Sequence, residues 1–123
     1  FHTALVPATH HLLNATNIEL LKPGCIVINT SRGAVVDTAA VAAALEAGAL
    51  WGAGIDVFEE EPLPADDPLV KAPHALLTPH AAYWSEESGR ELRERAMQAA
   101  IDAVQGRVPV DCLNPCVFDS SAR

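Results

Sequence analysis

Residues 25–58 read CIVINTSRGAVVDTAAVAAALEAGALWGAGIDVF. Residues 25–29 form a continuous apolar run, which is typical of a strand buried on both faces of a parallel sheet. Asp37 can cap a helix that carries apolar side chains at helical spacing and ends at Gly48. Residues 52–58 form a second apolar run, whose glycines favour close packing by a neighbouring helix. Strand, helix and strand in this order predict a βαβ unit.

Shorter elements flank this unit. Thr16 and Glu19 have the spacing of a capping box, which predicts a helix of about two turns ending at Lys-Pro-Gly, residues 22–24. Residues 59–73 hold four of the nine prolines and five acidic residues, which predicts a surface loop. Residues 75–78 predict a third short strand.

The longest predicted helix is capped by Ser85 and runs to Gln105, where Gly106 stops it. Its apolar side chains fall on one face: Leu92, Ala96, Ala99, Ala100, Ala103 and Val104. We expect residues 107–123 to form a loose tail. Together the elements indicate an α/β fold in which helices flank a parallel sheet.

Composition narrows the class of protein. The 123 residues suit a single core, and 16 acidic against 8 basic side chains give a formal net charge of −8. This balance, without a cluster of Lys and Arg, argues against nucleic-acid or membrane partners and favours small molecules or proteins. No apolar stretch approaches the roughly 18 residues that span a bilayer. Three cysteines without a disulfide pattern favour a soluble, cytoplasmic protein. Because the chain begins at Phe1 inside an apolar segment, we expect it to be part of a longer protein.

Polar side chains follow the ends of the three predicted strands. Arg32 follows the first strand, the acidic cluster Glu59–Glu61 the second, and His80 the third. Ligands bind outside the carboxyl ends of parallel strands, so we expect these groups to converge there. An Arg binds a carboxylate with two parallel hydrogen bonds, and a His supported by a Glu can move a proton. The trio suits a reaction on an α-keto or α-hydroxy acid, although taken singly Arg32 and the glutamates also fit solvated surface residues.

Four motifs resemble those of the D-isomer-specific 2-hydroxyacid dehydrogenases. They are Asn29–Gly33, Val36–Asp37, Gly52–Pro62 and Leu77–His80, and the resemblance extends over residues 1–110. It implies the second half of a Rossmann-type NAD-binding domain, followed by a helix that returns to a substrate domain.

Two further segments, Phe1–Leu5 and His80–Glu86, are similar to the C-terminal-binding-protein branch of that family. This branch includes transcriptional corepressors and bacterial dehydrogenase-like relatives. Where the corepressors have Trp followed by Tyr, this sequence has Tyr83 followed by Trp84. Because of this departure, the resemblance does not predict the size of the substrate.

The resemblance implies roles for individual residues. Arg32 matches the residue that clamps the substrate carboxylate, and Glu61 the residue paired with the catalytic His. His80 matches that His, the general acid when NADH reduces a 2-keto acid and the base in the reverse direction. The implied cofactor contacts are Thr3, Thr30, Ser31, Arg32, Asp56, His80, Ala82 and Tyr83, and the implied substrate contacts are Arg32 and Trp84.

The resemblance also implies a domain division and shows what the chain lacks. We expect residues 1–84 to be the C-terminal part of the NAD-binding domain, residues 85–106 a helix linking back to the substrate domain, and residues 107–123 a tail. No Gly-x-Gly-x-x-Gly occurs, because Gly52-Ala53-Gly54 is followed by Ile55-Asp56-Val57. The acidic residue that selects NAD over NADP is absent with it.

The remaining candidates predict no metal site. Cys112 and Cys116 have the wrong spacing for a zinc knuckle, and Cys25 fits a small core residue. The pair His10-His11 and His74 fall in loop-like contexts, and we expect all three to be solvated.

Two functions remain open. The first is an NAD-dependent D-2-hydroxyacid dehydrogenase, homodimeric when full length, that interconverts a 2-keto acid and a D-2-hydroxy acid by hydride transfer. The alternative is an NAD(H)-sensing, corepressor-like binding protein with little turnover.

Overall fold

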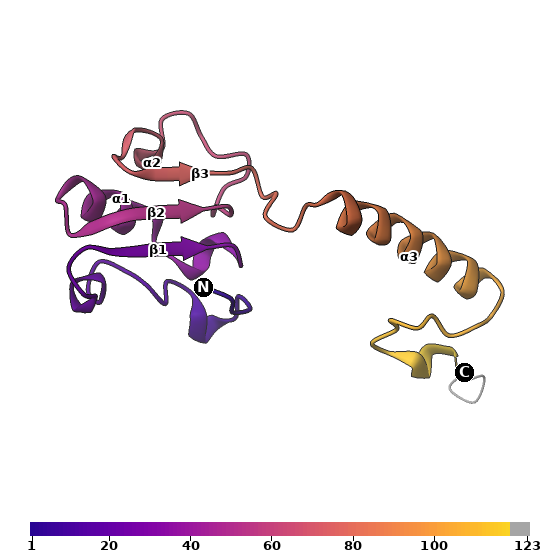
Figure 1. Ribbon diagram of the computed structural model, residues 1–123. Coiled ribbons are helices and arrows are strands. Elements are labelled where there is room, and N and C mark those ends of the chain that lie inside the picture. Colours follow the sequence, from indigo (N-terminus) through magenta and orange to yellow (C-terminus); the bar gives the residue numbers. More distant parts are fainter. Residues whose placement is uncertain (119–123) are drawn as a thin grey trace. The chain divides into compact units, whose positions relative to one another are not determined.

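The computed structural model describes residues 1–118 and contains a three-stranded parallel sheet. The strands are β1 (Cys25–Asn29), β2 (Leu50–Ile55) and β3 (Ala75–Leu77), and they lie side by side in that order (Figure 1). Asn29 pairs with Ile55, and Ile55 pairs with Leu77. The three strands therefore end level with one another, and the chain segments that follow them emerge at one edge. The predicted α/β class and βαβ unit are confirmed.

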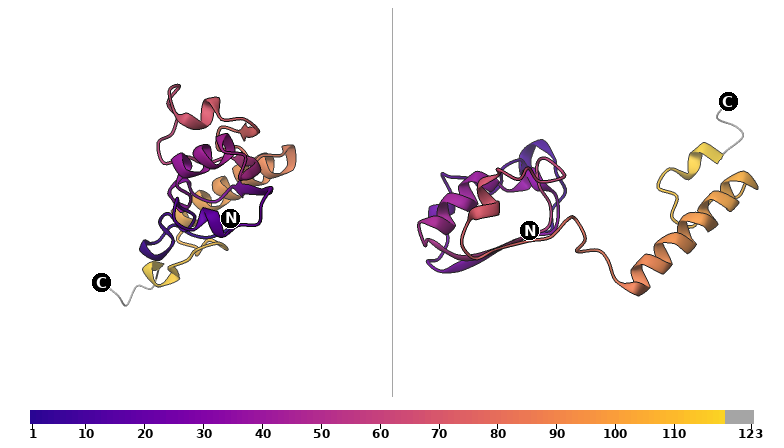
Figure 2. Two further views of the ribbon diagram at one scale, coloured as in Figure 1. Left: turned by 90° about the vertical axis from the view of Figure 1, so that its left-hand side faces the viewer. Right: turned by 90° about the horizontal axis from the view of Figure 1, so that it is seen from above.

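Two helices cover one face of this sheet (Figure 2). Helix α1 (Thr38–Glu46) begins as predicted, because Asp37 accepts a hydrogen bond of 3.0 Å from the Ala40 N–H. It ends before Gly48, whose φ of 69° is left-handed. Helix α2 (Pro68–Lys71) is a single turn inside the expected surface loop. Its Leu69 is fully buried and, with the partly buried Leu63 and Ala72, anchors the loop to the core.

The opposite face of the sheet is open in residues 1–82. Ile26, Ile28 and Leu76 are 54%, 56% and 69% exposed. The expectation that residues 25–29 are buried on both faces is therefore wrong, because α1 and α2 both cover the other face. The expected packing of a helix on the β2 glycines is also wrong. A Cβ at Gly52 would instead meet the His74 carbonyl oxygen at 3.3 Å, and one at Gly54 the Ile28 side chain at 3.8 Å.

The predicted helix after Thr16 is wrong, because only the 3-10 turn η2 (Ile18–Leu20) forms there. The Asn14 side chain accepts hydrogen bonds from the N–H groups of Thr16 and Asn17, and Asn17 accepts one from the Asn14 N–H. These local hydrogen bonds occupy backbone N–H groups that a helix cap would otherwise bind. Gly24, with φ of 73°, does form the predicted left-handed turn.

Strand β2 is displaced from the predicted range, beginning two residues earlier than residue 52 and ending three residues before residue 58. Beyond Ile55 the pairing continues for one residue, because the Asp56 N–H donates to the Asn29 carbonyl at 3.0 Å and the Asp56 carbonyl accepts from the His80 N–H at 2.8 Å. The Asp56 side chain binds the loop after β3. Two further 3-10 turns, η1 (Pro7–Thr9) and η3 (Gly33–Val35), lie in the connections.

The chain divides into two compact units, and the second begins at Tyr83. It contains α3 (Glu86–Val104), capped by reciprocal hydrogen bonds between Ser85 and Ser88 and followed by the left-handed Gly106. The helix expected over residues 85–105 is thus confirmed.

The described part of the expected tail, residues 107–118, is not simply loose. Asp111 forms an ion pair with Arg95 of α3, and Arg107 forms one with Asp102. The 3-10 turn η4 (Pro115–Phe118) follows, and the remainder of the tail lies outside the described residues. In residues 1–118, no helix is both long enough and apolar enough to cross a membrane.

Candidate active site

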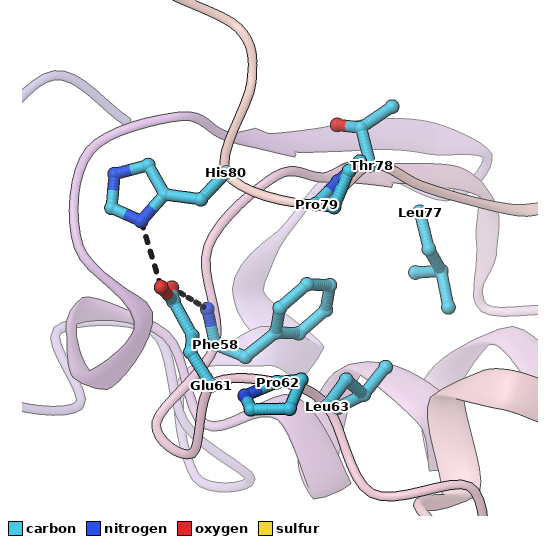
Figure 3. A pocket seen from close by; sticks show the side chains of 8 residues that line it. All are labelled: Phe58, Glu61, Pro62, Leu63, Leu77, Thr78, Pro79 and His80. Atoms are coloured by element: carbon cyan, nitrogen blue, oxygen red, sulfur yellow. Dashed lines mark hydrogen bonds and ion pairs between the residues drawn. The ribbon is translucent and has the colours of Figure 1, made fainter.

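His80 and Glu61 form a hydrogen-bonded pair at the edge where the strands end. The Nδ1 atom of His80 lies 2.8 Å from Oε2 of Glu61, and Oε1 of Glu61 accepts a 3.0 Å bond from the Phe58 N–H (Figure 3). Two hydrogen bonds hold the pKa of Glu61 below its usual range. The bond from His80 has the larger effect, and the bond from Phe58 adds to it. An ionised Glu61 fixes the imidazole with its proton on Nδ1, which leaves Nε2 for a ligand.

Asp56 holds the loop that carries His80. This side chain is only 3% exposed. Its Oδ1 accepts bonds of 2.5 Å from the Thr78 hydroxyl and 2.8 Å from the Ala81 N–H, and its Oδ2 accepts one of 3.0 Å from the Ala82 N–H. Burial alone would raise the pKa of Asp56, but these three donors and the nearby His80 outweigh it and lower the pKa.

The backbone of His80 is strained, and the same network supports it. Its φ of 53° is left-handed, a conformation that costs a non-glycine residue on the order of 1–3 kcal/mol. The His80 N–H donates to the Asp56 carbonyl at 2.8 Å, and the carboxylate of Asp56 binds the next two residues. The loop therefore imposes one direction on the imidazole.

A cavity of about 520 Å³ lies beside the pair. The polar groups of His80 and Glu61 lie at one end of it, and Leu63 and Leu77 at the other (Figure 3). Such a site, apolar with a few convergent polar groups, is typical for a small organic ligand.

Arg32 is placed by a different residue, Asn29. The Asn29 side chain is fully buried, donates to the Arg32 carbonyl at 2.9 Å and accepts from the Ser31 N–H and hydroxyl at 3.1 and 2.8 Å. The Arg32 guanidinium is exposed and donates to the Ser31 carbonyl at 2.7 Å. Arg32 lines a second depression, of about 680 Å³, together with Thr3, Thr30 and Ser31.

The structure brings the expected site residues together only in part. Arg32, Glu61 and His80 all follow strands that end at the same edge, and the last two are in contact. In residues 1–118, Arg32 has neither a hydrogen bond to His80 nor an ion pair with Glu61. Of the expected cofactor contacts, Thr3, Thr30 and Ser31 line the depression with Arg32. Ala82 lies in the loop that carries His80, and Asp56, which follows β2, is hydrogen-bonded to that loop.

Tyr83 and Trp84 belong to the second unit. Their rings meet edge to face, with centroids 6.3 Å apart. Trp84 lies over Gly89 of α3, where an added Cβ would come within 2.6 Å of the indole. Gly89 thus provides the space that the indole occupies.

His11 corrects one expectation. Its Nε2 atom lies 2.9 Å from Oε1 of Glu59, so His11 is not simply solvated. The two residues are 48 positions apart, and no local spacing could have indicated the contact. His74 stacks on the exposed Trp51, with ring centroids 6.1 Å apart. Sequence reasoning also gave no role to Asn29, although a polar residue at the end of an apolar strand was a usable signal.

One group of side chains has ligand spacing for a metal ion. In the described part of the chain, ligand atoms of His10, His11 and Glu59 lie within 4.8 Å of one another. The hydrogen bond between His11 and Glu59 already accounts for this proximity, so we assign no metal. The three cysteines are free thiols, and Cys25 packs against the core as expected.

Comparison with known proteins identifies the family. The sequence profile of the NAD-binding domain of D-isomer-specific 2-hydroxyacid dehydrogenases matches residues 1–82. The chain belongs to this family. Glyoxylate/hydroxypyruvate reductase B of Citrobacter koseri is 42% identical over 113 residues, which cover 92% of the chain and 35% of the reductase. This 2-hydroxyacid dehydrogenase chain therefore spans about a third of the length of that curated relative.

Solved structures of similar proteins share the fold. The TT0316 protein from Thermus thermophilus matches with a TM-score of 0.83 and 42% identity, over 89% of this chain and 35% of that one. D-lactate dehydrogenase with NAD⁺ from Lactobacillus jensenii matches with a TM-score of 0.79 and 30% identity, over 89% and 37% of the two chains.

The residues of this 2-hydroxyacid dehydrogenase chain fit one part of a dinucleotide. Three residues that carry hydroxyl groups, Thr3, Thr30 and Ser31, line the depression beside β1, where the strands end. Such groups suit a ribose and the ring attached to it. The glycine-rich turn that binds a pyrophosphate at a helix N-terminus does not occur in the 123 residues.

Proposed function

We propose that the protein carrying this chain is an NAD(P)-dependent oxidoreductase that interconverts a 2-keto acid and a D-2-hydroxy acid. The observation that carries the proposal is the His80–Glu61 pair, 2.8 Å apart, at the edge of a parallel sheet beside an apolar cavity. Membership of the family supports the same reaction class.

The chain's own residues have separate tasks in this proposal. In reduction, His80 donates the proton on Nε2 to the keto oxygen, and in oxidation it removes the proton from the hydroxyl. Glu61 accepts from Nδ1 and favours the protonated imidazole. Arg32 holds the substrate carboxylate with two parallel bonds. The nicotinamide cofactor, when bound, supplies or accepts the hydride.

The same proposal assigns residues of this chain to the cofactor site. Thr3, Thr30, Ser31 and Arg32 would contact it from the depression beside β1, and Ala82 and Tyr83 from the loop after His80. Because both oxygens of Asp56 are bound by loop donors, its contribution would be to hold that loop. Trp84 would select the substrate together with Arg32.

The proposed domain division keeps residues 1–84 in the NAD-binding domain, residues 85–106 as the linking helix and residues 107–123 as a tail. The family resemblance is also the basis for proposing a homodimer located in the cytoplasm.

The names of the relatives favour small substrates. The Citrobacter protein is named for glyoxylate and hydroxypyruvate, and the Lactobacillus protein for D-lactate. We therefore propose a small 2-keto acid. Neither of these two relatives is named as a C-terminal-binding protein, so they give no support to the corepressor branch.

A steady-state assay tests the proposal. The intact protein is given NADH or NADPH with glyoxylate, hydroxypyruvate and pyruvate in turn. We expect turnover on at least one of these acids. Tight binding of NADH with slow turnover on every acid would favour the corepressor-like alternative.

A further inference from the structure

The turn that carries Glu61 is held on a second side, away from His80. Glu59, two residues before Glu61, is hydrogen-bonded to His11, with Oε1 of Glu59 2.9 Å from Nε2 of His11. The Phe58 N–H, in the same turn, binds Glu61 at 3.0 Å. The turn from Phe58 to Glu61 is thus held by His80 at Glu61 and by His11 at Glu59.

The backbone of this turn packs directly against Gly33. A Cβ atom at Gly33 would lie 2.0 Å from the carbonyl carbon and oxygen of Phe58 and 2.5 Å from the Glu59 nitrogen. Backbone atoms at these distances leave room for glycine alone. Because Gly33 directly follows Arg32, the turn that carries Glu61 rests on the segment that carries the substrate-binding arginine.

His11 is anchored on the same segment. Its N–H donates to the Ala34 carbonyl at 2.8 Å, and its own carbonyl accepts a 2.9 Å bond from the Asn14 side chain. These bonds hold His11 at a φ of 47°, in the left-handed region. Both partners of the His11–Glu59 hydrogen bond therefore rest on η3, which contains Gly33 and Ala34.

We propose that His11, Glu59 and Gly33 are positioning residues that hold the Phe58–Glu61 turn on η3 and so keep Glu61 at Nδ1 of His80. The kinetic consequence rests on the proposed function, whereas the structural consequence does not. The side chains of His11 and Glu59 are 32% and 41% exposed, and a contact between side chains this exposed adds little to global stability, even when both are charged. The effect should therefore fall on the geometry of the site more than on unfolding.

The test uses Glu59→Gln and His11→Asn in the intact protein. Asn tolerates the left-handed backbone of His11 and is too short to reach Glu59. Matched controls are Asp66→Asn, an exposed acid of the same loop, and His74→Asn, an exposed histidine with φ of 57°. Gly33→Ala is left out of the test, because it can prevent folding.

We expect each test variant to lower kcat roughly 10-fold, since small misplacements of catalytic groups are costly. The KM, the Kd for NADH and the unfolding midpoint should match those of the controls. The double variant should be no worse than His11→Asn alone, because His11→Asn removes the contact that Glu59→Gln weakens.

A second readout needs no turnover. The titration of Glu61, followed by ¹³C NMR, should move to higher pH in both test variants, because a loosened turn weakens the bonds that lower the pKa of Glu61. A Glu61 titration identical to that of the controls would overturn the inference. Absence of turnover in the wild type would instead refute the proposed function and leave the titration to decide the positioning role.

Discussion

The two oxygens of Glu61 bind two donors, one from a side chain and one from the backbone. Because Oε1 is bound by Phe58 and Oε2 by His80, the carboxylate cannot rotate without losing a bond. Its lowered pKa keeps it ionised across the neutral range. The charge of Glu61, as well as its shape, therefore acts on the imidazole.

Replacing Glu61 by Gln separates these two contributions. Gln keeps the shape but removes the negative charge that favours protonated His80. Because reduction needs that proton, the alkaline limb of the kcat/KM profile should move to lower pH. If the alkaline limb stayed in place for Glu61→Gln and moved for Asp56→Asn, Asp56 would be the carboxylate that acts on His80.

His80→Ala removes the proposed general acid. We expect kcat for keto-acid reduction to fall roughly 100- to 10,000-fold, the usual contribution of such a group. The affinity for NADH, measured by fluorescence titration, should change far less. A collapse of binding together with turnover would show that His80 mainly supports the loop or the cofactor.

Arg32→Lys keeps the charge and loses the geometry. A single ammonium cannot form the two parallel bonds of a guanidinium with a carboxylate. A hydrogen bond to a charged group contributes about 1.5–3 kcal/mol. We therefore expect kcat/KM to fall roughly 10- to 150-fold. An unchanged kcat/KM would remove Arg32 from the site.

Among the elements, those with local signals were predictable from the sequence. Helices α1 and α3 begin where Asp37 and Ser85 cap them, and Gly48 and Gly106 follow their ends. Each of these signals acts within a few residues, so the sequence alone carries it.

Features that depend on distant partners were not predictable. The open face of β1 is set by which side α1 and α2 cover, not by the apolar run of residues 25–29. The pairing of His11 with Glu59 joins segments 48 positions apart. Within the candidate site, the motifs placed Arg32, Glu61 and His80 at one edge of the sheet. No local signal indicated that Gly33 supports the turn at Phe58 and Glu59, because these residues are distant in the sequence.

Asp56→Asn tests the link between β2 and the loop after β3. The amide would present a donor to one of the N–H groups of Ala81 and Ala82 that now donate to the carboxylate. We expect destabilisation of about 1–3 kcal/mol, measured by denaturant unfolding against Asp66→Asn. Similar unfolding of the two variants would contradict the proposed anchoring role.

The destabilisation expected for Asp56→Asn depends on pH in a definite direction. The folded-state pKa of Asp56 lies below its ordinary value of 3.8. Stability from the ionised carboxylate is therefore complete above that value and is lost as pH falls through the folded-state pKa. The difference in stability between wild type and Asp56→Asn should shrink in that acid range. A difference that stayed constant with pH would exclude the carboxylate charge as its source.

At the scale of the whole chain, apolar surface is left uncovered in each unit. Ile26, Ile28 and Leu76 lie on the open sheet face, and Leu92 and Ile101 of α3 are 58% and 44% exposed. Contiguous apolar surface of this kind and an unpaired strand edge favour association. The 123-residue chain also lacks a glycine-rich turn to hold a pyrophosphate.

We therefore expect the 123 residues, expressed by themselves, to self-associate and to bind NADH too weakly to measure. Light scattering and nucleotide fluorescence test the two parts. Ile28→Lys should reduce association, because it places a charge on the open sheet face, whereas Leu20→Lys, at a side chain 84% exposed elsewhere, should not. Equal effects of the two lysines would exclude the sheet face as the contact. A monomer that binds NADH in the micromolar range would mean that Thr3, Thr30, Ser31 and the His80 loop hold the cofactor without a pyrophosphate-binding turn.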